Sequence, residues 1–254
     1  MPGFASLSLA SAAALKAASL NLCTDELLLT LARPEQIVSV THLAHKAEET
    51  PLWGQARRYP LNDGTLLSVV QRRPTLVFTM GGQGQDRQRI AERLGIRTIV
   101  LPFPQHLDDV IASVRTVAGA LGAADKGEAL IRQMASLRRT APAARTDTLF
   151  LSSGGLTVAA DGLAADWMRL AGLRQRPIRG DRVSLEQLLV APPSVLLKSS
   201  YRSGQYSIEQ RWLSHPLARR AKAGRTVTTD GRLWTCMGPL LVPEILRLRR
   251  ELAR

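Results

Sequence analysis

The sequence predicts an α/β protein with two doubly wound lobes, each built on a parallel sheet, joined by a single long helix. Strand and helix patterns alternate from residue 20 to residue 101, and the same alternation starts again at residue 148. Between these stretches, residues 106–139 keep apolar residues at helical spacing. Strands that alternate with helices at such distances are typical of parallel sheets with right-handed crossovers. We therefore expect two similar lobes on either side of a helical connector.

The first lobe opens with residues 20–40, where a strand end, a helix and a second strand follow one another closely. Thr24 or Asp25 is expected to cap the helix, and Pro34 is expected to stop it. The strand end, Cys23 and the start of the helix meet at one point. Free backbone N–H groups at that point can face a ligand.

Turn signals divide the chain that follows. Residues 75–80 form a buried strand, residues 86–94 a helix closed by Gly95, and residues 96–101 the next strand. A stop and a new cap near residues 119–124 divide the helical region in two. The second half of that region is long enough to cross from one lobe to the other as a stiff connector.

The second lobe repeats the same order of elements. The expected strands are residues 148–151, 195–197 and 226–228, and the expected helices are residues 163–170, 185–189, 210–213 and a terminal helix that ends near residue 252. We accordingly divide the chain into a remnant of a signal peptide (1–18), a first lobe (19–122), a connecting helix with its linker (123–144) and a second lobe (145–254).

The composition is that of a folded protein with a basic surface. Hydrophobic residues make up 45% of the chain and charged residues 22%, so a large core can be buried. Lys and Arg outnumber Asp and Glu by 34 to 21, which gives a net charge of +13. Because the arginines are spread along the chain, no dedicated nucleic-acid arm is indicated. The charge fits an ordinary basic surface, or attraction to an anionic ligand or membrane.

The first residues and the two cysteines bear on where the protein works. Residues 1–19 are small and mildly apolar with Lys16 as the one charge, which is typical of the back half of a signal peptide; a cytosolic helix tail is the alternative. The first interpretation predicts a periplasmic protein.

Cys23 and Cys236 lack the spacing of a zinc site, and they can pair only if the two ends of the chain meet.

Candidate ligand contacts follow the predicted strands, because ligands of parallel sheets bind at the carboxyl ends of the strands. These positions are Cys23-Thr24, His42, residues 80–83, residues 152–155, Tyr201-Arg202 and residues 234–236. Small, hydroxyl and aromatic side chains predominate there without a catalytic constellation, which predicts a binding protein and not an enzyme. Four loop aromatics and Met80 suit a flat, partly apolar ligand, and Arg202 is available for a carboxylate. The aromatic residues are Trp53, Tyr59, Tyr201 and Trp234.

Incomplete sequence motifs are present for three other functions, which are nucleotide binding, metal binding and hydrolysis. Gly82 to Arg87 resembles a dinucleotide-binding loop and would suit a doubly wound nucleotide-binding enzyme, but Arg87 stands where a third glycine is needed. His42 and His45 have no third metal ligand near them in the sequence, so no metal site is expected. Ser153 lies outside any nucleophile-elbow motif, which speaks against a hydrolase.

Several segments together carry a resemblance to a known family. They are SLNLCTDELLLTLARPEQIVSVTHLA, LLSVVQRRPTLVFT and RIAERLGIRTIVLPFPQHLDDVIASVRTVAGALG in the first half, then SLEQLLVAPPSVLL and WTCMGPLLVPEILRL in the second. In their order and spacing they resemble the periplasmic solute-binding proteins that serve ABC importers of cobalamin, ferric siderophores and haem. The resemblance covers nearly all of the chain from Ala18. It implies two lobes joined by one long helix, a ligand held between them with little hinge motion, and a monomer that delivers its ligand to a membrane permease and its ATPase.

The resemblance also assigns roles to residues and narrows the ligand. It places ligand contacts at Thr24, His42, Met80, Gly81, Gly82, Ser153, Tyr201 and Trp234, and permease docking at Asp86 (or Glu92) and Glu209. Met80 stands where some cobalamin binders present an aromatic residue. Arg202 and the net charge favour a carboxylate-bearing ligand over neutral sugars. The candidate ligands are a ferric siderophore, haem, a quinone cofactor with several carboxylates, and cobalamin, against which the methionine at position 80 counts. No intrinsic cofactor is expected.

Overall fold

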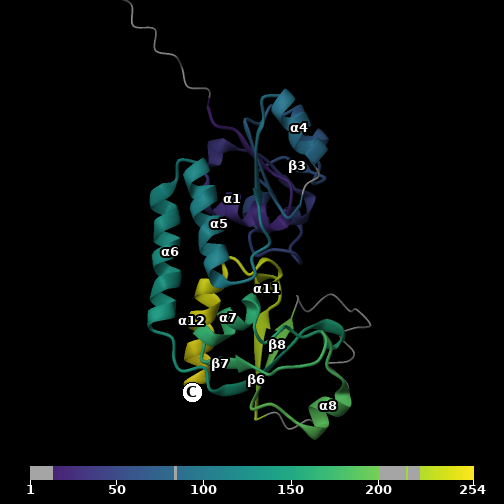
Figure 1. Ribbon diagram of the computed structural model, residues 1–254, viewed down its shortest axis with the longest axis vertical. Helices are drawn as coiled ribbons and strands as arrows, with labels where there is room; N and C mark the ends of the chain where they lie inside the picture. Colours follow the sequence, from purple (N-terminus) through teal and green to yellow (C-terminus); the bar gives the residue numbers. More distant parts are fainter. Residues whose placement is uncertain (1–13, 83–84, 201–215, 217–223) are drawn as a thin grey trace, which may run out of the picture.

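The structure consists of two α/β lobes, one above the other, with helices running along one side of both (Figure 1). It is a computed structural model that describes residues 14–82, 85–200, 216 and 224–254. Within the two sheets, every described strand pairing is parallel. Helices pack on both faces of each sheet, so the predicted doubly wound architecture is confirmed.

The sheet of the first lobe has five strands in the order β3-β2-β1-β4-β5. These strands are β1 (Ala17–Ser19), β2 (Ile37–Thr41), β3 (Leu61–Asn62), β4 (Leu76–Met80) and β5 (Arg97–Leu101). Because side chains alternate along a strand, Phe78 of β4 faces one layer of helices and Val77 faces the other. The first layer contains α1 (Leu22–Leu31) and α5 (Leu107–Ala120), and the second contains α3 (Leu67–Val70) and α4 (Gln85–Arg93).

The start of the first lobe corrects two predictions. Ala17 and Ala18 lie fully buried in the central strand, so the predicted boundary after residue 18 falls inside the sheet and the lobe includes residue 17. The cap of α1 is Asn21, not Thr24 or Asp25, because the Asn21 Oδ1 accepts a hydrogen bond from the backbone N–H of Thr24 at 2.9 Å. Three short helices flank β2. They are η1 (Pro34–Gln36) before that strand, and η2 (His42–His45) and α2 (Trp53–Ala56) after it.

The sheet of the second lobe has four strands in the order β7-β6-β8-β9. These are β6 (Thr146–Leu151), β7 (Leu173–Gln175), β8 (Val195–Ser200) and β9 (Arg225–Asp230). On one face lie α7 (Leu163–Leu170) and α12 (Leu241–Leu252), and on the other lies α8 (Leu185–Val190). The sequence analysis missed β7, a three-residue edge strand, and its predicted helix at residues 210–213 lies outside the described residues.

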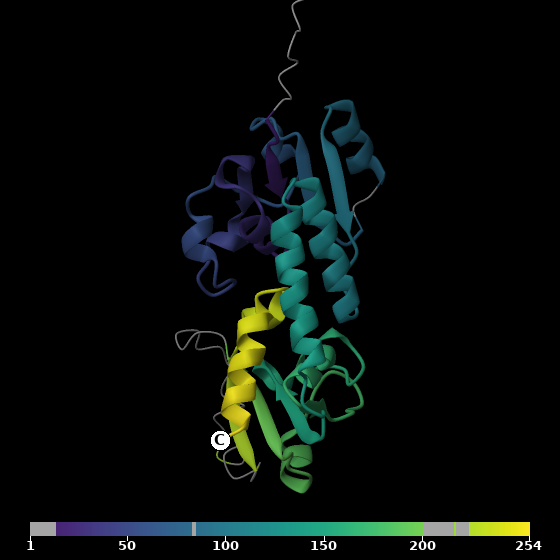
Figure 2. The same ribbon diagram turned by 90° about the vertical axis from the view of Figure 1, so that its left-hand side faces the viewer.

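The connector is α6 (Ala124–Arg139), which runs antiparallel to α5 and continues from the first lobe to the second (Figure 2). Gly127 permits the close approach of these two helices, since a Cβ there would lie 2.4 Å from the Cβ of Ala118. Buried residues of α5, α6, α7 and α12 form one continuous apolar core with those of both sheets. None of the described helices is long and apolar enough to cross a bilayer.

Candidate ligand-binding cleft between the lobes

A cavity of about 340 Å³ lies between the lobes and is mostly apolar. The first lobe contributes Cys23, Met80, Phe103 and Pro104, and the second contributes Val158, Ala159, Gly162, Leu163, Ala164, Thr235, Cys236 and Met237. Met80 ends β4, and Phe103 follows β5. The cavity therefore lies at the carboxyl ends of parallel strands, where ligands of such sheets bind.

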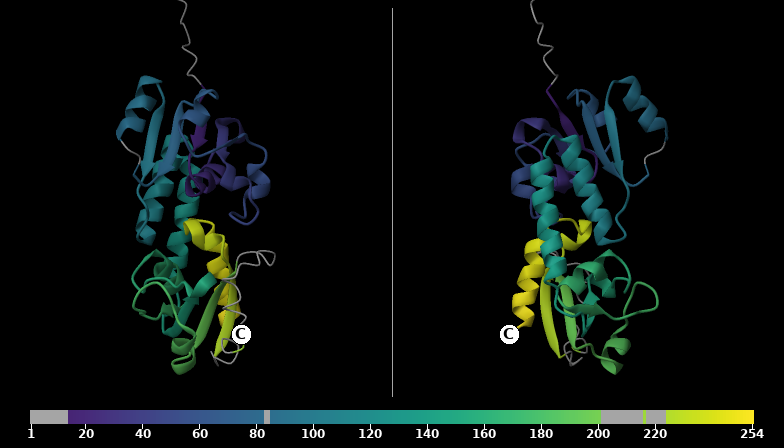
Figure 3. Two further views of the ribbon diagram at one scale, coloured as in Figure 1. Left: turned by 90° about the vertical axis from the view of Figure 1, so that its right-hand side faces the viewer. Right: turned by 60° about the vertical axis from the view of Figure 1, so that its left-hand side comes forward.

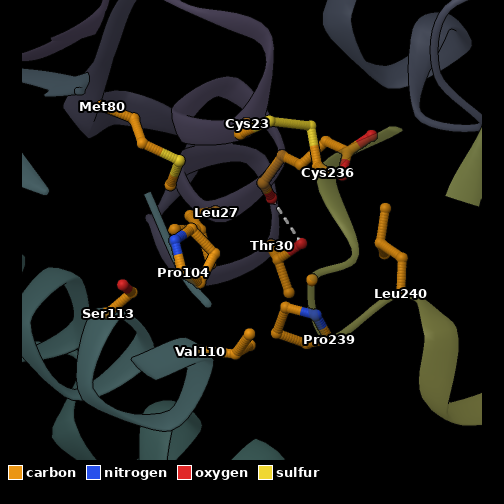
Figure 4. A pocket seen from close by; sticks show the side chains of 12 residues that line it. Cys23, Leu27, Thr30, Met80, Pro104, Val110, Ser113, Cys236, Pro239 and Leu240 are labelled. Carbon is orange, nitrogen blue, oxygen red and sulfur yellow. Dashed lines mark hydrogen bonds between the residues drawn. A yellow bond between two sulfur atoms is a disulfide. The ribbon is translucent and has the colours of Figure 1, made fainter. Parts of the chain in front are cut away.

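A smaller space of about 20 Å³ adjoins this cavity and shares four lining residues with it, Cys23, Met80, Pro104 and Cys236. In Figure 4 the Cys23–Cys236 disulfide lies along one edge of this space, with Met80 and Pro104 on one side and Leu240 on the other. The Oγ of Ser113 also lines this space and has no hydrogen-bond partner. The space is large enough for one water molecule bound to that hydroxyl.

A disulfide joins the two lobes at the cleft. Cys23 lies in the first turn of α1, and Cys236 ends α11 (Leu233–Cys236), so the bond links segments 213 residues apart with a Cα–Cα distance of 5.2 Å. The pairing left open by the sequence is therefore present. Figure 3 shows why it can form, because the chain before α12 rises to the underside of the first lobe. The bond holds the two walls of the cleft at a fixed separation on this side.

Polar contacts tie the lobes together at two further places. On α7, the Asp166 Oδ2 accepts a hydrogen bond from the backbone N–H of Leu107 at 3.1 Å, so a carboxylate of the second lobe caps α5. Near α11, the Arg232 guanidinium pairs with Asp230 and donates to the Ala47 carbonyl of the first lobe at 2.9 Å. Together with the disulfide, these contacts link the two lobes at three places.

Two buried carboxylates lie side by side in α1. The Asp25 carboxylate accepts hydrogen bonds from the backbone N–H of Thr41 at 3.0 Å and from its hydroxyl at 2.5 Å, and the Glu26 carboxylate accepts one from the Thr50 hydroxyl at 2.8 Å. Burial raises the pKa of Asp25 to about 6 and that of Glu26 to about 7, although these hydrogen bonds act in the opposite direction. Asp25 fastens α1 to the end of β2, and Glu26 fastens it to the segment that follows this strand. This role was not predicted from the sequence.

Two of the predicted contact residues have side chains that turn inward. Thr24 is fully buried, and its hydroxyl lies 2.7 Å from that of Ser19 within the cap of α1. Trp234 is also buried: its ring packs 5.0 Å from that of Phe150, and its Nε1 donates to the Thr229 hydroxyl at 2.8 Å. Neither side chain lines the cavity, so both support its wall from behind.

The other predicted residues divide between the cleft, the surface and the undescribed part of the chain. Met80 lines the cavity, whereas His42 is exposed on η2, and Ser153 is half-buried on η3 (Ser153–Gly155) without lining it. Gly82 is exposed just after β4, and Asp86 lies on α4. Tyr201, Arg202 and Glu209 lie outside the described residues. Among the residues that are described, no cluster of three His, Cys, Asp or Glu side chains suits a metal ion.

Gly81 has a different role from the predicted ligand contact. It is buried with a φ of 79°, and a Cβ at this position would lie 2.2 Å from the Phe103 ring. Glycine therefore makes room for the aromatic ring, which remains 63% exposed at the cleft. The sequence analysis missed Phe103, although its place directly after a strand and between two prolines was a usable signal.

The two-lobe architecture is shared with solved periplasmic binding proteins. The haem-binding protein RhuT from Roseiflexus sp. RS-1 in its apo form matches with a TM-score of 0.66 and 19% identity over 93% of this chain and 97% of that one. The haem-binding protein HutB of Vibrio cholerae matches with a TM-score of 0.71 and 16% identity over 94% and 99%, respectively. The vitamin B12-binding protein BtuF of Vibrio cholerae matches with a TM-score of 0.64 and 12% identity over 92% and 95%.

These likenesses define the class of fold. The chain has the fold of two-lobe periplasmic binding proteins, as the sequence predicted. No protein-family model matches the sequence, and no curated protein matches it significantly.

Proposed function

We propose that this protein is the extracytoplasmic solute-binding component of an ABC importer and that it captures a tetrapyrrole. The observation that carries the proposal is the apolar cleft between the lobes, at the strand ends of the first sheet and beside α7 and α11 of the second. Two solved proteins with this fold are the haem-binding protein HutB and the vitamin B12-binding protein BtuF. A binding role, without catalysis, follows from the same likeness and from a cleft wall of neutral side chains.

The chemistry of the cleft wall narrows the predicted range of ligands. No charged side chain is present among the described residues that line the main cavity. Burying a charged or strongly polar ligand there would leave its polar groups without partners, which is costly. A flat apolar ring with carboxylates at its edge fits better, because the ring can lie against Phe103 and the carboxylates can remain in water. Haem therefore suits this wall better than a ferric siderophore.

Ligand binding to the purified protein tests the proposal. We expect haem to bind with a dissociation constant in the micromolar range or below, measured by absorbance titration, and a ferric hydroxamate siderophore to bind far more weakly. Ala159 is exposed and lines the cavity, so Ala159→Trp is expected to fill the cleft and weaken haem binding by at least about tenfold. Ala253→Trp, at an exposed position near the end of the chain, is the matched control and should bind as the parent does.

The delivery step has its own test. Asp86 and Glu209 are the proposed contacts with the permease, and the partner complex would include its ATPase. Reversing either charge, Asp86→Lys or Glu209→Lys, is expected to reduce ligand uptake by cells without changing the affinity of the purified protein. Uptake that survives both reversals would count against this docking mode. Separately, we expect the purified protein to be a monomer in solution, as measured by sedimentation.

A further inference from the structure

Two methionines line the cleft from opposite lobes. Met80 ends β4 of the first lobe, and Met237 directly follows α11 of the second. Both line the main cavity, and both are only partly buried. The other described methionines, Met134 and Met168, are fully buried in the core, which is the usual place for methionine as a filler of irregular space.

The backbone of Met237 indicates that its position is imposed by its surroundings. It has φ 49° and ψ 35°, in the left-handed region that side chains other than glycine rarely adopt. The next residue is a glycine, Gly238, but the left-handed position itself is occupied by the methionine. The buried Trp167 Nε1 donates a hydrogen bond to the Met237 carbonyl at 2.9 Å and so holds the turn. Helices commonly end in a left-handed residue, and the C-cap of α11 is this methionine.

Both methionines are fixed to the same junction between the lobes. The Asn21 amide donates to the Met80 carbonyl at 3.3 Å, and the same Asn21 caps α1. Two residues further on, Cys23 forms the disulfide with Cys236, the neighbour of Met237. The backbones that carry the two methionines are therefore tied to one another, as a pre-organised pair of ligands requires.

The described lining of the main cavity contains no competing donor of comparable strength. It includes no histidine, tyrosine or carboxylate, and its two cysteines are joined to each other. Thioether sulfur is a soft, neutral ligand that binds soft metal centres and serves as an axial ligand of haem iron. We propose that Met80 and Met237 bind the metal of the captured tetrapyrrole, which is an iron porphyrin. This inference rests on the proposed function.

Absorbance titrations with two probes, haem and metal-free protoporphyrin, test the inference on the intact protein. The parent protein is expected to bind haem at least about tenfold more tightly than the metal-free ring, and reduced haem more tightly than oxidised haem. Met80→Leu combined with Met237→Leu keeps the volume and removes both sulfurs. This variant is expected to bind the two porphyrins equally and to change the absorption spectrum of the bound iron. Met134→Leu, in the core, is the matched control and should leave the preference and the spectrum unchanged.

Each outcome decides the matter. Equal affinity of the parent for both porphyrins, or an unchanged iron spectrum in the double variant, overturns the metal-binding role while the proposed function stands. Failure of the parent to bind either porphyrin overturns both. Met237→Gly protects against a folding artefact, because glycine adopts the left-handed backbone freely and removes only the side chain. It is expected to keep the melting temperature and to lose most of the preference for haem.

Discussion

Two regions hold the lobes together, and they differ in their chemistry. On the helix side, α5, α6, α7 and α12 share one apolar core that extends through both lobes, and Asp166 caps α5 across the boundary. On the disulfide side, Cys23 of α1 is bonded to Cys236 of α11, and the buried carboxylates of Asp25 and Glu26 fasten α1 to its neighbours.

The two regions differ in their expected sensitivity to redox state and pH. The helix side distributes its stabilisation over many apolar contacts, none of which depends on a thiol. The disulfide side depends on one covalent bond and on two groups whose pKa values lie near neutral pH. Because the cleft is lined by that same disulfide, changes of redox state or pH are expected to act at the ligand-binding region, while the helix side stays constant.

Loss of the disulfide is expected to have the largest effect. Replacing Cys23 and Cys236 by serine removes a link between residues 213 apart. Such a link stabilises a protein by about 3 kcal/mol, mainly by restricting the unfolded chain. We therefore expect the melting temperature to fall by about 10 °C, measured by differential scanning calorimetry. A reductant should lower the parent's melting temperature similarly and leave the serine variant unchanged; a parent indifferent to reductant would contradict the comparison.

The pH dependence of stability is the second expected effect. Burial raises the pKa of Glu26 from 4.5 to about 7, so the folded protein binds this proton more tightly than the unfolded chain does. The free energy of unfolding should therefore fall as the pH rises from about 4.5 to about 7 and then level off, by on the order of 3 kcal/mol. Urea unfolding between pH 5 and pH 8 measures it.

A glutamine at this position isolates the contribution. Glu26→Gln keeps an acceptor for the Thr50 hydroxyl and removes the titration, so its stability should vary less with pH than that of the parent. Glu128→Gln changes a half-exposed glutamate on α6 and is the matched control. Equal slopes for the parent and Glu26→Gln across this window would show that Glu26 does not carry the pH response.

Two glycines test how closely the helix side is packed. Gly127→Ala on α6 would push a Cβ to within 2.4 Å of Ala118 on α5, so it is expected to lower the free energy of unfolding by about 1–2 kcal/mol despite alanine's better helix propensity. A Cβ at Gly119 of α5 would meet no atom within 4 Å. Gly119→Ala should therefore raise that free energy by about 0.5–1 kcal/mol. Opposite signs in denaturant titrations support the close helix contact, and equal signs contradict it.

The sequence predicted the fold well because the fold depends on local patterns. Apolar alternation and turn residues are recognised within a few positions of sequence. Short windows therefore predicted a strand at residues 148–151, observed as Thr146–Leu151, and a helix at residues 163–170, observed with the same bounds. The cap of α1 was misassigned because Asn21, Thr24 and Asp25 are all good capping residues, and only the backbone geometry decides among them.

The candidate site was predicted less completely, for a physical reason. The rule that ligands bind at strand ends identifies segments but not the direction of their side chains. Met80 lines the cleft, whereas Thr24 and Trp234, also placed after strands, turn into hydrogen bonds behind the wall. Met237 was not singled out, because the contact of its turn with the first lobe depends on the packing of segments more than two hundred residues apart.

The smallest expected effect concerns the cap that Asp166 provides between the lobes. Asp166→Ala leaves the Leu107 N–H without its 3.1 Å partner and is expected to cost about 1 kcal/mol. Asp166→Asn retains an oxygen acceptor and should cost less.

Combining Asp166→Ala with the two serine substitutions tests whether the helix side and the disulfide side stabilise the protein independently. If the two regions act independently, the losses measured by urea unfolding add to within about 0.5 kcal/mol. A larger coupling energy would mean that the disulfide and the helix side form a single cooperative junction.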